Sequence, residues 1–125
     1  MKFLRNLIAS IFGTFIALGI IFMLFILIVS LASESEKIMI FKHSTRCSIS
    51  SSALNRLERN WNKETDAVKL KPYYLDLIAH RDISNKVAQQ WNITHESPQV
   101  LVIEKGKCTY HNSHMGIDYT ELMEL

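Results

Sequence analysis

The sequence predicts a small α/β domain that follows one long apolar helix. Three observations lead to this prediction. No charged residue occurs between Arg5 and Glu34. Beyond that stretch, short apolar runs typical of buried strands alternate with segments whose apolar residues recur at helical spacing. A chain of 125 residues has room for one such domain. The order strand, helix, strand, helix, strand, strand, helix predicts a mixed four-stranded sheet.

The apolar stretch is long enough to span a membrane, because about 20 apolar residues cross the hydrocarbon layer. A cleaved signal peptide is the alternative, since Lys2 and Arg5 form a basic start and residues 30–32 weakly resemble a cleavage site. An uncharged stretch of this length exceeds the usual apolar region of a signal peptide, about 7 to 15 residues. We therefore expect residues 1–33 to form a retained transmembrane anchor and residues 34–125 to form the domain.

The distribution of charged residues along the chain bears on membrane orientation and does not indicate nucleic-acid binding. All 12 acidic residues lie after residue 33, and the net charge of +2 corresponds to Lys2 and Arg5. The domain has no basic stripe with interleaved aromatic residues, so nucleic acid is not expected as a partner. The basic start favours a cytoplasmic N-terminus and an exported domain, whereas the basic residues of the segment 37–46 weaken that bias and leave the cytoplasmic face as the alternative.

The strands and helices are expected in a definite order. A short apolar run predicts a strand at 37–41, and helical spacing then predicts a helix at 47–61 that Thr45 or Ser48 caps. The remaining elements are a strand at 72–78, a helix from Asp82 or Ser84 to Trp91, strands at 99–103 and 107–111 joined by a turn at 105–106, and a last helix at 118–125.

Cys47 is the first candidate for chemistry. It is expected in the first turn of a helix that follows a buried strand, where free backbone N–H groups and the helix dipole stabilise a thiolate. Lys42 and Arg46 would act in the same direction if they lie near. Ser50 occupies the position where dithiol enzymes have a second cysteine, so it can donate a hydrogen bond but cannot resolve a mixed disulfide. The alternative is a buried structural thiol.

Pro98 supports the functional interpretation of Cys47. The pair Ser97-Pro98 directly precedes the third predicted strand, which is where the thioredoxin fold has a cis-proline facing its active cysteine. Backbone groups at this pair would bind an extended thiol substrate. An ordinary trans-proline at the first residue of a strand is the alternative.

The domain resembles the monothiol bacilliredoxin family, the YtxJ-type proteins of the bacillithiol system. The resemblance rests on the sequence blocks at 41–50, 73–75, 81–85, 95–101 and 111–114. It implies a thioredoxin-like fold with a glutaredoxin-sized core, and a monothiol disulfide oxidoreductase that removes bacillithiol from mixed disulfides on proteins. Cys47 would be the nucleophile and Pro98 the cis-proline. Bacillithiol would be the co-substrate, with no other cofactor.

The front of the chain departs from the family pattern. Family members usually have a strand and a helix before the block at 41–50, and here the apolar segment takes their place, so we expect the outer strand of the sheet to lose that cover. The segment beginning at Met1 resembles the anchor of membrane-bound signal peptide peptidases, although no catalytic domain of that family follows. A gene fusion would explain this combination. A non-catalytic, membrane-tethered binding module is therefore the alternative function.

The remaining candidates have weaker patterns. Cys108 is expected near the hairpin turn, roughly 17 to 20 Å from Cys47, which is too far for a disulfide between them. Zinc sites have tighter spacings than that of the histidines at 43, 111 and 114, so no metal is expected. Arg81 fixes a loop, binds the malate carboxylates of bacillithiol, or is a solvated surface charge.

Overall fold

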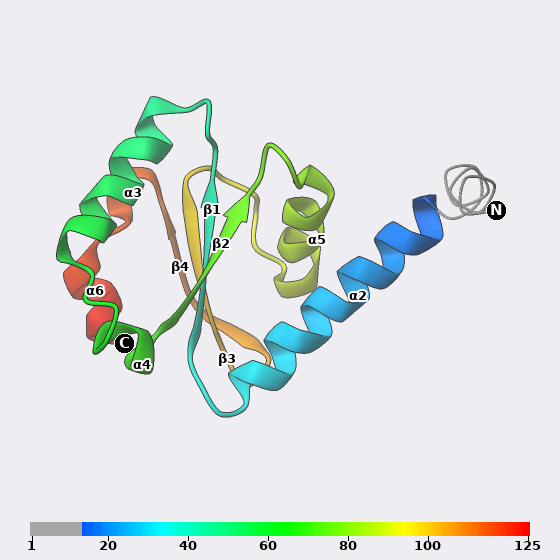
Figure 1. The fold of residues 1–125 in the computed structure, drawn as a ribbon, viewed down its shortest axis with the longest axis horizontal. Coiled ribbons are helices and arrows are strands. Elements are labelled where there is room, and N and C mark those ends of the chain that lie inside the picture. Colours follow the sequence, from blue (N-terminus) through cyan, green and yellow to red (C-terminus); the bar gives the residue numbers. More distant parts are fainter. Residues whose placement is uncertain (1–13) are drawn as a thin grey trace.

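The computed structural model describes residues 14–125, and their side chains from residue 19 onward. The helices are α2 (Thr14–Ser33), α3 (Ser48–Asn60), α4 (Asp66–Lys69), α5 (Arg81–Trp91) and α6 (Tyr119–Met123), with a 3₁₀ turn η2 at His114–Gly116. The strands are β1 (Ile38–His43), β2 (Lys71–Asp76), β3 (Gln99–Glu104) and β4 (Lys107–Ser113). Figure 1 shows helices on both faces of one sheet. The fold is the predicted mixed α/β, thioredoxin-like one.

The sheet has the order β2-β1-β3-β4. β1 runs parallel to β2 and antiparallel to β3, and β3 pairs antiparallel with β4. All four predicted strands are present, with bounds shifted by one or two residues. The short α4 and η2 were not predicted, because single helical turns carry no periodic apolar pattern. A two-residue turn with positive φ at Lys105 and Gly106 joins β3 to β4, as the sequence predicts.

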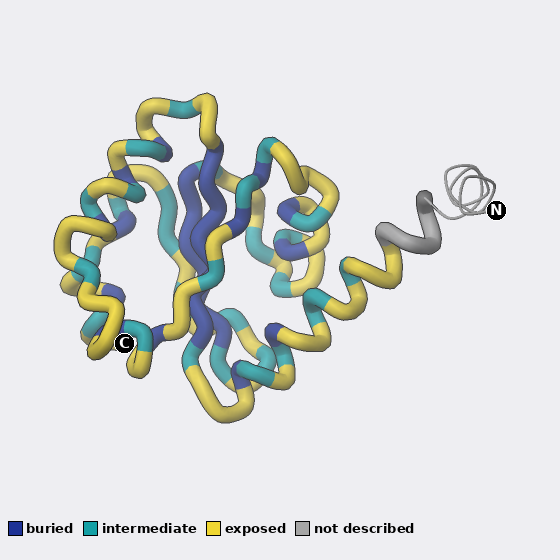
Figure 2. Tube along the Cα trace, in the orientation of Figure 1, coloured by how far each residue is buried: buried dark blue, intermediate teal, exposed yellow. Residues whose placement is uncertain are grey.

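Two apolar layers cover the two faces of the sheet. The layer under α3 and α6 consists of Met39, Phe41, Ala53, Leu57, Leu70, Val100, Val102, Ile117 and Leu122. The layer under α5 consists of Val29, Ile38, Ile40, Leu75, Val87, Leu101 and Ile103. Alternate residues of β1 belong to opposite layers, as a strand buried on both faces requires. In Figure 2 these central strands are the most buried part of the chain.

The last turns of α2 belong to this domain. Val29 is fully buried against the sheet, and the Ser33 hydroxyl accepts a hydrogen bond of 2.8 Å from the backbone N–H of Gly106. The Lys86 ammonium lies 5.4 Å from the centre of the Phe22 ring, which links α2 to α5. The end of the apolar segment thus supplies a helix beside α5 on one face of the sheet (Figure 1), whereas the outer strand β2 has no strand beyond it within the described part of the chain.

The remainder of α2 extends away from the domain (Figure 1). The exposed large apolar residues along the whole of α2 are Ile20, Ile21, Met23, Leu24, Leu27, Ile28 and Leu31. Among the described residues, no helix combines the length and the hydropathy that crossing a membrane requires. The predicted anchor also includes residues 1–13, which lie outside the described part.

Candidate functional site

Cys47 is the N-cap residue of α3 and is half-buried. Its backbone is extended, and its N–H donates to the Ser44 carbonyl at 3.1 Å, which closes a tight turn between β1 and the helix. Neither Thr45 nor Ser48 caps α3, contrary to the prediction. Thr45 lies within that turn, while Ser48 is already the first helical residue, so Cys47 itself occupies the cap.

This position suits a reactive thiol. The first N–H groups of a helix have no partner within the helix, and they carry its positive partial charge. Cys47 also has no side-chain capping bond in this structure. An anionic sulfur at the helix start would therefore be stabilised by N–H groups that are otherwise free.

Ser50 lies one turn further along α3 and is completely buried. Its hydroxyl oxygen accepts a bond from the Ser44 N–H at 3.0 Å and lies 2.7 Å from Nδ1 of His43. A serine hydroxyl has only one hydrogen to donate. Ser50 can give that hydrogen to His43 or to a thiolate at Cys47, but not to both. In this structure the Ser50 hydroxyl is engaged with His43 and with the Ser44 N–H.

His43 is the residue at this site whose importance the sequence reasoning missed. It is 5% exposed, and the centre of its ring lies 6.2 Å from that of Phe41 and 5.5 Å from that of Tyr74. Its place at the end of a predicted strand, four residues before Cys47, was a signal available in the sequence. A polar residue seven positions before Ser50 then meets the start of the helix, because the turn brings the chain back over the strand.

The Ser97–Pro98 peptide bond is cis, and Pro98 is buried at the start of β3. The neighbouring Gln99 pairs with Lys42, so Pro98 is level with the end of β1, where Cys47 follows. The Pro98 carbonyl accepts a bond of 3.0 Å from the His114 N–H. Among the described residues, the buried hydroxyl of Ser97 has no hydrogen-bond partner. The two predicted halves of the site thus share one end of the sheet.

Lys42 points away from α3. It is fully buried on the α5 face, where its ammonium donates to the Ser84 carbonyl at 3.2 Å and lies 3.4 Å from Nδ1 of His95. No carboxylate is among these contacts, and burial lowers the pKa of Lys42 to about 8. The ammonium of Lys42 thus contacts residues on the α5 side of the sheet, whereas Cys47 begins the helix on the other side.

The two arginines have different surroundings. Arg46 is exposed in the turn before Cys47, and Arg81 is exposed at the first residue of α5. The pKa of His95 is lowered by burial and by the charges of Lys42 and Arg81, which places Arg81 within electrostatic range of this histidine. Arg81 thus lies on the α5 side of the site.

Cys108 lies at the other end of the sheet. It pairs with Ile103, which in turn pairs with Ile38 at the beginning of β1, whereas Cys47 follows the end of β1. Burial raises the pKa of the Cys108 thiol, which favours its unreactive form. Between residues 14 and 125, no three His, Cys, Asp or Glu side chains gather as metal ligands would.

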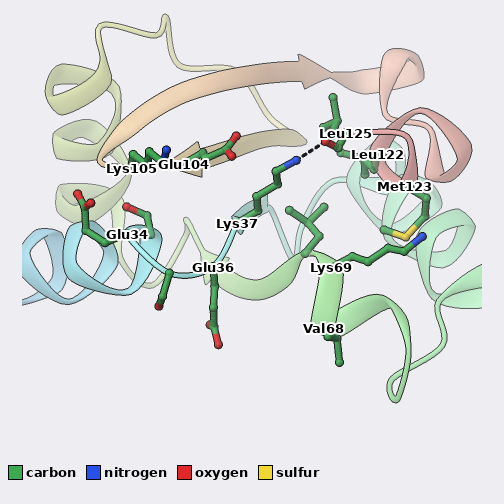
Figure 3. Close-up of a pocket in the computed structure, with 13 residues that line it drawn as sticks. Glu34, Glu36, Lys37, Val68, Lys69, Glu104, Lys105, Leu122, Met123 and Leu125 are labelled. Atoms are coloured by element: carbon green, nitrogen blue, oxygen red, sulfur yellow. Dashed lines mark hydrogen bonds between the residues drawn. The ribbon is translucent and has the colours of Figure 1, made fainter.

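A pocket of about 510 Å³ also lies at that other end. Figure 3 shows it between the end of α2, the β3–β4 turn and the C-terminus, where the Lys37 ammonium donates to the Leu125 carbonyl. It includes none of the residues around Cys47 and Pro98, so it belongs to a different part of the molecule.

Comparison with known proteins identifies the family. The profile of the monothiol bacilliredoxin BrxC matches residues 28–122, most of the chain. The chain belongs to this family. The match begins close to Val29, in agreement with the packing of the end of α2. It does not reach the N-terminal segment, so the resemblance of that segment to signal peptide peptidases stays a prediction.

Solved structures agree on the fold. One protein, described by a thioredoxin fold and a suggested oxidoreductase activity, is 29% identical and has a TM-score of 0.64, with 75% of this chain and 80% of that one covered. Fasciola hepatica thioredoxin is 18% identical with a TM-score of 0.54, covering 75% and 81%. Thioredoxin f2, solved with ferredoxin:thioredoxin reductase, is 18% identical with a TM-score of 0.55, covering 80% and 82%. Family and fold together support thiol–disulfide redox chemistry for this bacilliredoxin.

The buried ammonium of Lys42 has a consequence for stability. Its pKa in the folded protein, about 8, is below its value in the unfolded chain, so between about pH 8 and 10.5 the unfolded chain binds more protons. The free energy of unfolding should therefore rise with pH across this window, by up to about 3 kcal/mol. Lys42→Met should remove the rise and stabilise the protein at pH 7, measured by urea unfolding at several pH values. Parallel pH profiles for the two proteins would contradict this.

Proposed function

We propose that this bacilliredoxin removes bacillithiol from mixed disulfides on proteins, with Cys47 as its only reacting thiol. The observation that carries the proposal is the placement of Cys47 as the cap of α3, with the buried Ser50 three residues on in place of a second cysteine. A thiolate there is stabilised by the helix start, and no cysteine lies within one turn to resolve it.

The reaction has two exchanges. The Cys47 thiolate attacks the bacillithiol sulfur of the mixed disulfide, so that a disulfide forms between Cys47 and bacillithiol while the substrate disulfide breaks and the substrate protein leaves as a thiolate, which takes a proton from water. A second bacillithiol thiolate then attacks the bacillithiol sulfur bound to Cys47. Bacillithiol disulfide is released, and Cys47 is again a thiolate.

Residues on both sides of Cys47 would hold the substrate. The backbone at Ser97 and Pro98 lies at the same end of the sheet as Cys47, where an extended substrate segment would pair with it. The buried hydroxyl of Ser97, which has no partner among the described residues, is a candidate hydrogen-bonding group for that substrate. Arg46 and Arg81 are exposed cations that would attract the malate carboxylates of bacillithiol.

We further propose that the apolar N-terminal segment tethers the domain to a membrane. The support comes from the sequence, which has no charge between Arg5 and Glu34. Because Phe22 lies beside Lys86 of α5 and Val29 packs in the domain, the part free to enter lipid would be mainly residues 6–21, somewhat fewer than the roughly 20 residues that cross the hydrocarbon layer. The basic start favours a domain outside the cytoplasm, while a cytosolic supply of bacillithiol favours the cytoplasmic face.

Mass spectrometry tests which thiol reacts. The full chain in detergent micelles is treated with bacillithiol disulfide, and peptides are mapped. We expect one bacillithiol adduct, on Cys47, and the same result in a Cys108→Ser control, because Cys108 is half-buried with a pKa raised by burial. An unmodified Cys47 in folded protein would contradict the proposal and favour a non-catalytic, membrane-tethered binding module.

A further inference from the structure

We propose that two copies of this chain pair through their β2 strands, antiparallel, with Tyr74 of one copy opposite Tyr74 of the other. β2 is an edge strand of the sheet, since β1 is its only neighbouring strand within residues 14–125. An exposed edge presents backbone N–H and C=O groups that a strand of another chain can pair with. The groups that β2 presents fit a second copy of itself.

The outward-facing backbone groups follow from the hydrogen bonds to β1. Lys71 donates its N–H to the Lys37 carbonyl at 2.8 Å, and Leu77 donates to His43 at 3.0 Å. Odd-numbered residues of β2 therefore face β1, and the backbone groups of Pro72, Tyr74 and Asp76 face outward. Pro72 has no N–H, and the Asp76 carbonyl already accepts from His80 at 3.0 Å.

The remaining free groups are symmetric about Tyr74. They are the Pro72 carbonyl, the Tyr74 N–H and carbonyl, and the Asp76 N–H. In an antiparallel pair centred on Tyr74, each Asp76 N–H would donate to the Pro72 carbonyl of the other copy, and the two Tyr74 residues would exchange two bonds. Pro72 has no N–H to donate, and the Asp76 carbonyl opposite it in the other copy is already occupied, so neither position would leave an unpaired group. No orphaned donor or acceptor is left within this four-bond ladder.

The side chains on the α3 face favour the same pairing. The Tyr74 side chain is 55% exposed, and it lines a groove of about 630 Å³ beside the β2 edge. Most of its other lining residues are apolar, among them Met39, Phe41, Leu54, Leu57, Trp61 and Pro72, while Glu58 and Lys63 are the charged ones. In the proposed pair the two tyrosine rings would be direct cross-strand neighbours at the rim of this apolar groove. Aromatic pairs at such positions stabilise sheets.

Disulfide trapping tests the register. In a hydrogen-bonded antiparallel pair, opposed Cα atoms lie about 5.5 Å apart, within the range that a disulfide bridges. Tyr74→Cys is introduced into the full chain in detergent micelles, with Cys47 and Cys108 replaced by serine, and oxidised with copper phenanthroline. We expect a cross-linked dimer on a non-reducing gel, at least about tenfold more than from Tyr73→Cys, since two residues 73 would lie more than about 7 Å apart.

A charge substitution supplies the second readout. Tyr74→Lys places two like charges directly opposite each other and should convert a sedimenting dimer of the full chain into a monomer. Circular dichroism verifies that each variant is folded. A folded Tyr74→Cys protein that does not cross-link above the Tyr73→Cys level would overturn the proposal. A wild-type monomer, or a dimer that persists in folded Tyr74→Lys protein, would also overturn it.

Discussion

Replacing Cys47 with serine is expected to reduce bacillithiol exchange to the uncatalysed rate. A serine hydroxyl fits the same N-cap position, and serine is a preferred N-cap residue, so the fold should be retained. The hydroxyl does not attack a disulfide, since the thiolate is the nucleophile. The loss should therefore be complete rather than partial. It is measured as the release of bacillithiol from a bacillithiolated protein in the presence of excess bacillithiol.

The matched control is Cys108→Ser, which removes the other cysteine. Cys108 lies at the opposite end of the sheet, beside Ile103, and should not contribute to the reaction. We expect its variant to retain the wild-type rate. Exchange that survives Cys47→Ser and disappears in Cys108→Ser would assign the chemistry to the wrong end of the sheet and reject the mechanism.

The order of the elements could be predicted because each has a local signal. β1 and β3 are continuous apolar runs, and α3 and α5 have apolar residues at helical spacing. The packing of α2 had no such signal. In an uncharged segment every residue is a candidate for lipid, so the sequence does not distinguish Val29, which is buried against the sheet, from the exposed Ile28. That distinction depends on contacts with strands far along the chain.

The candidate site could be predicted in part for the same reason. Cys47 and Ser50 are three residues apart in one helix, so their relation follows from local geometry. Lys42 and His43 are neighbours in a strand, and neighbouring strand residues point to opposite faces. His43 therefore reaches Ser50, while the ammonium of Lys42 contacts Ser84 and His95. The sequence places both residues near the thiol, but it does not state which face of the sheet α3 covers.

A second large effect is expected from Val29→Asp, because it would place a carboxylate among apolar side chains. Val29 is fully buried in the layer that includes Ile38, Ile40 and Leu101. An unpaired buried charge costs at least about 3 kcal/mol, a large share of the roughly 5 to 15 kcal/mol that keeps a domain folded. We expect the melting temperature of the full chain in detergent micelles to fall by at least about 12 °C.

Ile28→Asp is the matched control, since it makes the same substitution one residue earlier on a side chain that is 55% exposed. Surface substitutions usually change stability by no more than about 0.5 kcal/mol, so its melting temperature should stay within a few degrees of wild type. The comparison separates a helix that only crosses lipid from one whose end is part of the domain. If the two variants melted together, the last turns of α2 would not contribute to the core. A selective loss with Val29→Asp would mean that the domain depends on the end of α2 for its stability. Cutting the chain at residue 34 would then expose the face of the sheet that Val29 covers.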